Sequence, residues 1–167
     1  MIPTRVESMT TGGPALSIVI PVYNEQGAID DLMTAIEAAM GSFVGGYEIV
    51  FVDDGSTDDT LERLKRHAAA SSRVRVFSFR RNLGKSPALT CGFQKAAGRY
   101  IATMDADLQD DPADIPRIYA HMKREQVSVV SGWRKDRRDS WLKIVSSRMF
   151  NLIVVRKIER ASCRERV

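Results

Sequence analysis

The chain of 167 residues is 44% hydrophobic and 28% charged, a composition typical of a soluble globular domain with a real core. It contains no run of eighteen apolar residues to span a bilayer, and its two cysteines are too few for a disulfide framework. The net charge of +4 is uneven: residues 134–167 carry 11 basic against 4 acidic side chains, and residues 1–133 carry 14 against 17. A body without excess positive charge argues against nucleic acid as a partner.

Apolar runs alternate with helical patterns along the chain. Continuous apolar runs are typical of buried parallel strands, whereas apolar residues three and four positions apart indicate helices. In chain order we predict strand 16–20 ended by Pro21, helix 29–40, strand 47–52, helix 60–70 capped by Ser56 or Thr57, strand 74–79, helix 88–98 after a Ser86-Pro87 cap, strand 100–104, helix 113–125 after an Asp111-Pro112 cap, and strand 127–132. This alternation predicts an α/β fold with a mostly parallel sheet and helices on both faces.

Polar clusters follow each of the first four predicted strands: PVYNE, DDGSTDD, RRNLGKS and DADLQDD. In parallel sheets, ligands bind outside the carboxyl ends of the strands. The sequence therefore predicts that the four clusters meet at one edge and form a site.

The acidic stretch after the fourth strand carries the most specific chemistry. Residues two apart in an extended segment point the same way, so Asp105 and Asp107 can face one cation, with Gln109 next on that side. Mg²⁺ and Mn²⁺ prefer such oxygen ligands and keep coordination places for substrate phosphates. The acids that follow are interpreted as helix caps: Asp110, Asp111 and Asp114.

The other clusters leave alternatives open. Asp53 and Asp54 could accept hydrogen bonds from a ribose hydroxyl or a base N–H, or could simply end a strand before a charged helix start. Tyr23 beside Glu25 could hold a base by stacking and hydrogen bonding, or begin a helix. The basic loop around Lys85 is similar to a phosphate loop but lacks the first glycine of a Walker motif, and it also suits a solvated turn.

Four stretches in this order and spacing, IVIPVYNE, VDDGSTDDT, RNLGKSPALTCGF and MDADLQDDP, resemble the family 2 glycosyltransferases with the GT-A fold, over about residues 16–150. The subgroup resembled is the polyprenyl-phosphate glycosyltransferases, including dolichol-phosphate mannose synthases and undecaprenyl-phosphate sugar transferases. The resemblance implies inverting transfer of a hexose from a nucleotide-diphosphate sugar (GDP-mannose or a UDP-sugar) to a polyprenyl phosphate. It also implies Mg²⁺ or Mn²⁺ as cofactor and a location at the cytoplasmic face of a membrane.

The resemblance implies roles for residues at matching positions. Asp107 and Arg134 are the expected catalytic residues; Arg134 would approach the diphosphate or the acceptor phosphate, although it could simply belong to the basic tail. The metal ligands implied are Asp105, Asp107 and Gln109. The nucleotide sugar is expected to contact Pro21, Tyr23, Glu25, Val52, Asp53, Asp54, Lys85, Asp105 and Ala106.

A lipid phosphate acceptor is already anionic and needs no protein base, whereas a sugar hydroxyl acceptor would need an Asp or Glu. Neither His67 nor His121 is predicted near the site. A metal-dependent nucleotidyltransferase is the alternative enzyme, although the glycine-rich basic loop expected after its first strand is missing. A phospho-acceptor signalling domain is a third hypothesis, but it gives Asp105 and Asp107 no role.

The sequence divides into four predicted parts: a disordered tail over 1–15, a nucleotide-sugar-binding domain over 16–134, a basic amphipathic segment over 135–158, and an atypical terminus over 159–167. The basic segment predicts a helix on an anionic membrane surface, or a core helix with basic ends. Members of the resembled family usually continue further, often with membrane-spanning helices. We therefore expect a truncated or foreign C-terminus, and the fragment could be inactive.

Overall fold

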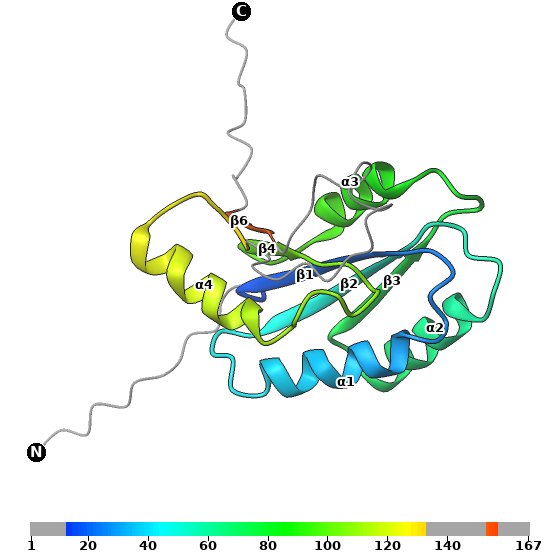
Figure 1. Ribbon diagram of the computed structural model, residues 1–167, viewed down its shortest axis with the longest axis horizontal. Helices are drawn as coiled ribbons and strands as arrows, with labels where there is room; N and C mark the ends of the chain where they lie inside the picture. Colours follow the sequence, from blue (N-terminus) through cyan, green and yellow to red (C-terminus); the bar gives the residue numbers. More distant parts are fainter. Residues whose placement is uncertain (1–12, 133–152, 157–167) are drawn as a thin grey trace, which may run out of the picture.

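The computed structural model describes residues 13–132 and 153–156. Within these residues the strands form one sheet in the order β3-β2-β1-β4-β6-β5 (Figure 1). Strands β1 to β4 run parallel, and β6 is antiparallel to both β4 and β5. The strands are β1 (Leu16–Val22), β2 (Tyr47–Asp53), β3 (Val74–Ser78), β4 (Tyr100–Thr103), β5 (Val129–Ser131) and β6 (Ile153–Arg156). The helices are α1 (Ile29–Met40), α2 (Thr60–Ala70), α3 (Lys85–Lys95) and α4 (Asp114–Glu125).

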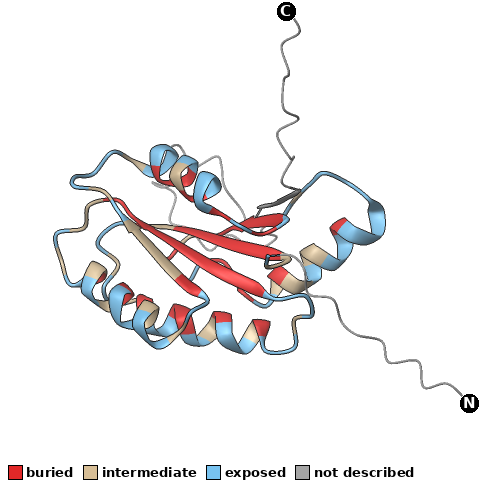
Figure 2. Cartoon of the chain, turned by 180° about the vertical axis from the view of Figure 1, so that it is seen from behind, coloured by how far each residue is buried: buried red, intermediate tan, exposed pale blue. Residues whose placement is uncertain are grey.

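The helices cover both faces of the sheet, with α1, α2 and α4 on one face and α3 on the other (Figure 1). Side chains alternate along β2: Ile49 and Phe51 belong to the core cluster on the α1 side, and Val50 and Val52 to the cluster on the α3 side. Strands β1 and β2 are buried almost throughout (Figure 2), which explains their continuous apolar runs. The predicted α/β fold is confirmed.

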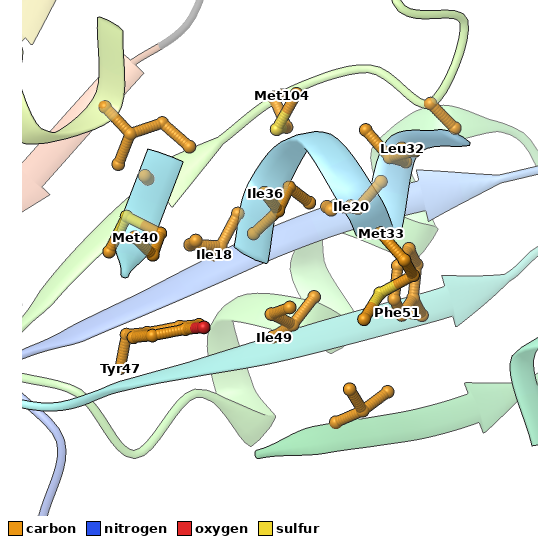
Figure 3. Packing of buried hydrophobic residues seen from close by; sticks show 14 of the residues in the cluster. Ile18, Ile20, Leu32, Met33, Ile36, Met40, Tyr47, Ile49, Phe51 and Met104 are labelled. Atoms are coloured by element: carbon orange, nitrogen blue, oxygen red, sulfur yellow. The ribbon is translucent and has the colours of Figure 1, made fainter. Parts of the chain in front are cut away.

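Helix α1 covers the larger of the two core clusters, the one on its own side of the sheet. Its buried side chains recur at helical spacing and pack over side chains of β1 and β2 (Figure 3). Met104, directly after β4, belongs to the same cluster and is 2% exposed. The segment that leads into Asp105 is therefore anchored in the core. The buried residues of α1 are Ile29, Leu32, Met33, Ile36 and Met40.

Strand β1 does not end at Pro21, as predicted, but continues to Val22. Strand β4 pairs with β1 only as far as Val19. The proline, which lacks an N–H, therefore lies where β1 has β2 as its partner but no longer β4. The pairing with β2 keeps the chain extended up to Val22, where the loop after β1 begins.

Two helices differ from the prediction at their amino ends. Helix α2 starts at Thr60 and is not capped by Ser56 or Thr57, because these two residues bond to the loop after β1 instead. Helix α3 starts at Lys85, one residue before the predicted Ser86 cap. In both places a contact with another loop outweighs the local capping preference.

Part of the segment predicted as an amphipathic helix is a strand. Residues 153–156 form β6, which pairs with β4 on one side and β5 on the other, so the helix prediction is wrong for these residues. The β-branched run Ile-Val-Val suits a strand, and its partners lie far away in the sequence. The sheet thus includes a strand that lies beyond residue 134, where the nucleotide-sugar-binding domain was predicted to end. The rest of the predicted membrane-surface segment lies outside the described residues. Among the helices that the structure describes, none has the length and apolar character to cross a bilayer.

A buried glutamate joins the amino ends of the strands, at the edge opposite the polar loops. Glu48 of β2 is 6% exposed. Its Oε1 accepts hydrogen bonds from Ser17 Oγ at 2.6 Å and from the Ala97 N–H at 2.5 Å, and its Oε2 accepts one from Arg75 at 2.9 Å. Burial alone would raise the pKa of Glu48, but these three donors outweigh it and hold the pKa below its ordinary value of 4.5.

We expect Glu48 to make folding stability depend on pH. Because its pKa is lower in the folded chain, its stabilising contribution is present above pH 4.5 and is lost as the pH falls through the folded pKa. Urea unfolding of the wild type and Glu48→Gln is the measurement. The variant should be less stable by roughly 2 kcal/mol at neutral pH, with the difference closing as the pH falls below 4.5. A difference of constant size across this range would contradict the prediction.

Candidate functional site

The carboxyl ends of β1, β2 and β4, together with the start of α3, line an open cavity of about 320 Å³. This is the edge of the sheet at which the polar clusters are predicted to meet. The structure brings together, as lining, these residues predicted from the sequence: Pro21, Tyr23, Glu25, Asp54, Lys85, Asp105, Ala106 and Asp107. Val22, Asn82 and Gly84 are the other lining residues.

Three further predicted residues lie outside the cavity lining, and a fourth is not among the described residues. Val52 is buried in the core cluster under α3. Asp53 is 1% exposed and does not line the cavity; its Oδ2 accepts a hydrogen bond from Ser78 Oγ at 2.8 Å and so holds the end of β3. Gln109 is exposed on the turn after the acidic pair, outside the cavity lining. Arg134 lies outside the described residues.

The loops after β1 and β2 are joined by hydrogen bonds that run in both directions. Ser56 Oγ accepts a hydrogen bond from the Asn24 N–H at 2.9 Å, and Asn24 Oδ1 accepts one from the Thr57 N–H at 2.8 Å. Further along, Gln26 Oε1 accepts a hydrogen bond from the Asp59 N–H at 3.0 Å. This exchange fixes the backbone on both sides of the glutamate that lines the cavity.

Asp54 connects the loop after β2 to the basic loop after β3. The N–H groups of Leu83 and Gly84 donate to its two carboxylate oxygens, each at 2.8 Å. Gly55 permits this approach, since it has a φ of +73° and a Cβ there would lie 2.5 Å from the carbonyl carbon of Arg81. Asp54, which is predicted to contact the nucleotide, therefore also positions the start of α3.

The acidic pair lies directly after β4. Asp105 Oδ1 is 2.6 Å from Lys85 Nζ, in an ion pair that joins this loop to the first residue of α3. Asp107 Oδ1 accepts a hydrogen bond from the Gln109 N–H at 3.1 Å. Ala106, between the two acids, is 4% exposed. Both acids line the cavity, as their spacing of two residues predicts.

Negative charge accumulates around Glu25. Burial raises the pKa of Glu25 above its ordinary value of 4.5, and repulsion from Asp107, Asp58 and Asp105 raises it further. A divalent cation would relieve this repulsion. Over residues 13–132 and 153–156, no three His, Cys, Asp or Glu side chains are grouped so that they could hold a metal ion. The donor set instead suits Mg²⁺ or Mn²⁺ held by one or two carboxylates together with phosphate oxygens of a substrate.

Some residues of the site escaped the sequence interpretation. Asn82 and Gly84 line the cavity, and Asn24 joins the two loops beside it. Asn24 has a φ of +55°, a left-handed conformation that asparagine adopts more readily than most residues. An asparagine two residues after the end of β1 was the signal for this turn. The sequence carries no comparable signal for Asn82, whose place depends on the contact between two loops.

Comparison with known sequences identifies relatives. Residues 17–165 match the family described as Glycosyl transferase family 2. Dodecaprenyl-phosphate galacturonate synthase from Rhizobium johnstonii is 38% identical over 143 residues, covering 84% of this chain and 42% of that protein. Undecaprenyl-phosphate 4-deoxy-4-formamido-L-arabinose transferase from Sodalis glossinidius is 40% identical over 147 residues, covering 87% of this chain and 45% of that protein. The chain thus spans less than half the length of these curated relatives.

Solved structures share the architecture. A mannosyltransferase from Pyrobaculum calidifontis in complex with GDP-Man and Mn²⁺ superposes with a TM-score of 0.64 at 24% identity, covering 75% of this chain and 37% of that chain. Glucosyl-3-phosphoglycerate synthase from Mycobacterium tuberculosis, in complex with Mn²⁺, UDP and phosphoglyceric acid, gives 0.64 at 23% identity, covering 86% and 56%. At these identities the likeness shows the fold alone, which is GT-A as expected. Because the family match extends over most of the sequence, this chain belongs to glycosyl transferase family 2.

Proposed function

We propose that this chain binds a nucleotide-diphosphate sugar and supplies the donor site of an inverting glycosyltransferase whose acceptor is a polyprenyl phosphate. The observation that carries the proposal is the cavity at the strand ends, where Asp105 and Asp107 lie with Glu25 and Lys85. Both curated relatives are named for a polyprenyl phosphate, dodecaprenyl in one and undecaprenyl in the other, which supports this acceptor class. Their names differ in the sugar. A hexose donor, and the choice between GDP-mannose and a UDP-sugar, therefore stay predictions.

The residues proposed to hold Mg²⁺ or Mn²⁺ are Asp105, Asp107 and Gln109. A divalent ion bound there supplies positive charge that stabilises the departing diphosphate. The Mn²⁺ in the two structural neighbours supports a divalent cofactor. The Gln109 N–H donates to Asp107 Oδ1 and so holds this carboxylate within the turn.

The nucleoside is proposed to lie against the loop after β1. Tyr23 is 43% exposed, so its ring can stack on a base, and Pro21 also lines the cavity. Glu25 supplies an acceptor for a ribose hydroxyl or a base N–H. The Glu25 N–H donates to Thr60 Oγ1 at 2.9 Å, which holds the glutamate backbone against the start of α2.

The proposed transfer needs no protein base, because an acceptor phosphate oxygen is already anionic. That oxygen would attack the anomeric carbon in line while the nucleoside diphosphate leaves, which inverts the configuration. His67 lies 2.8 Å from Asp30 and His121 lies 3.1 Å from Arg124, and neither lines the cavity. The contact of Arg134 with a phosphate stays a prediction. A polyprenyl phosphate is a membrane lipid, so we propose that the reaction takes place at a membrane. Its location at the cytoplasmic face stays a prediction.

Calorimetric titration of the chain with UDP-glucose, UDP, GDP-mannose and GDP, each with and without Mn²⁺, tests the proposal. We expect either the uridine or the guanosine pair to bind at least about 10-fold more tightly with Mn²⁺, because the cation neutralises the diphosphate beside two carboxylates. Tight binding of nucleoside triphosphates, with no binding of diphosphates, would favour a nucleotidyltransferase instead. A folded chain without any Mn²⁺-dependent nucleotide binding would contradict the proposal.

A further inference from the structure

Lys85 contacts a carboxylate oxygen that a metal ion would use. Lys85 Nζ is 2.6 Å from Asp105 Oδ1, and both residues line the same cavity. An ammonium group and a divalent cation on this one oxygen would be two positive charges within a few ångströms, which repel each other strongly. The ion pair and metal coordination through this oxygen therefore compete with one another.

The fold holds the backbone of Lys85 but leaves its side chain room to turn. Lys85 is the first residue of α3, and it follows Gly84, which has a φ of +96°. The N–H groups of Gly84 and Leu83 are held by the carboxylate of Asp54. The Lys85 side chain is 41% exposed. A lysine stem with four carbons can redirect its ammonium group by several ångströms without movement of the helix.

A diphosphate offers Lys85 another partner, since phosphate oxygens carry negative charge and form charge-assisted hydrogen bonds with ammonium groups. We propose that Lys85 is a positioning residue that makes the binding of the divalent metal and of the nucleoside diphosphate interdependent. The diphosphate draws the ammonium group away from Asp105, and the released oxygen becomes available to the metal. This inference rests on the proposed function, because it requires a metal-bound diphosphate as the ligand.

The test compares the wild type with Lys85→Met, which removes the charge but keeps a stem of similar length. Lys65→Met is the matched control, because Lys65 forms an exposed ion pair of 2.7 Å with Glu62 on α2, away from the cavity. Mn²⁺ is titrated into each folded chain, alone and with saturating UDP or GDP, and free Mn²⁺ is read by electron paramagnetic resonance. Circular dichroism and thermal unfolding establish that each variant is folded.

In the wild type and in Lys65→Met, we expect the nucleotide to tighten Mn²⁺ binding by about 10-fold or more. In Lys85→Met, Mn²⁺ alone should bind about 5-fold more tightly than in the wild type. The nucleotide should then tighten Mn²⁺ binding by a smaller factor than in the wild type, because only the direct contact between metal and diphosphate still couples the two ligands. Removing a residue with a merely structural role would weaken Mn²⁺ binding in the absence of nucleotide. Loss of a positive charge from the cavity raises Mn²⁺ affinity by itself, so the reduced effect of the nucleotide is the decisive readout.

Weaker or unchanged binding of Mn²⁺ alone by Lys85→Met, or an unaltered effect of the nucleotide, would overturn the inference and leave the proposed function standing. A wild type without any Mn²⁺-dependent nucleotide binding would overturn both. Should Lys85→Met fail to fold, Lys85→Gln is measured in the same way, and the same results support or overturn the inference.

Discussion

Replacing Asp107 by asparagine is expected to weaken Mn²⁺-dependent nucleotide binding by at least about 100-fold, since a carboxylate ligand is lost from a cation held by few protein groups. Asp107 lines the cavity, whereas the neighbouring Asp105 already forms an ion pair with Lys85. Asparagine has the same shape and keeps an oxygen that can accept the hydrogen bond from the Gln109 N–H. We therefore expect the turn and the fold to persist.

Asp114→Asn is the matched control for Asp107→Asn. It removes the same charge seven residues further on, where Asp114 pairs with the exposed Arg117 at 2.8 Å. Calorimetry with Mn²⁺ and the preferred nucleoside diphosphate should show wild-type affinity for the control variant. Equal losses in the two variants would mean that Asp107 acts only through the general negative charge of this region, and unchanged affinity in Asp107→Asn would remove it from the proposed metal site.

Gly55→Ala is expected to lower the free energy of unfolding by about 3 kcal/mol or more and to impair nucleotide binding as well. A Cβ at this position would lie 2.5 Å from the carbonyl carbon and 2.7 Å from the Cα of Arg81, which are backbone atoms and cannot turn aside. The two loops would have to separate. Separation would break the hydrogen bonds from Leu83 and Gly84 to Asp54, and with them the placement of Lys85.

Gly46→Ala is the control that separates the effect of backbone strain from the effect of the Cβ contact with Arg81. Gly46 has a φ of +75°, nearly the same as the +73° of Gly55, but a Cβ there would meet nothing within 4 Å. Its substitution should therefore cost only the strain of the left-handed backbone, about 1 kcal/mol. Urea unfolding of the two variants measures the difference. Similar losses of stability would show that the loop contact at Arg81 relaxes easily, against our expectation.

The local pattern of apolar residues was sufficient to predict most of the helices and strands. Strand β2 was recognisable as a buried strand because both of its faces are covered, so Ile49 and Val50 are apolar alike although they point to opposite sides. Helix α1 was recognisable because its buried side chains recur at helical spacing. Strand β6 was not, because its partners β4 and β5 lie far away along the chain, and the basic residues around it favoured an amphipathic helix.

The meeting of the acidic pair with the loops after β1 and β2 was predictable, because the carboxyl ends of parallel strands share one edge of a sheet. The partners within that edge were not predictable. Asp53 and Asp54 are adjacent and chemically identical, yet one holds the end of β3 and the other lines the cavity while holding the start of α3. Ser56 and Thr57 look like helix caps, yet they bond to Asn24.

The order of residues was thus enough to establish the α/β class, the edge that carries the site and the acidic pair after β4, because these follow from periodicities of two and 3.6 residues and from strand direction. Three features were decided only by the tertiary structure. Lys85 pairs with Asp105, Asp54 accepts hydrogen bonds from the loop before α3, and β6 lies between β4 and β5. Each of these depends on distances between segments that are remote in the chain, and no local spacing of residue types encodes such distances.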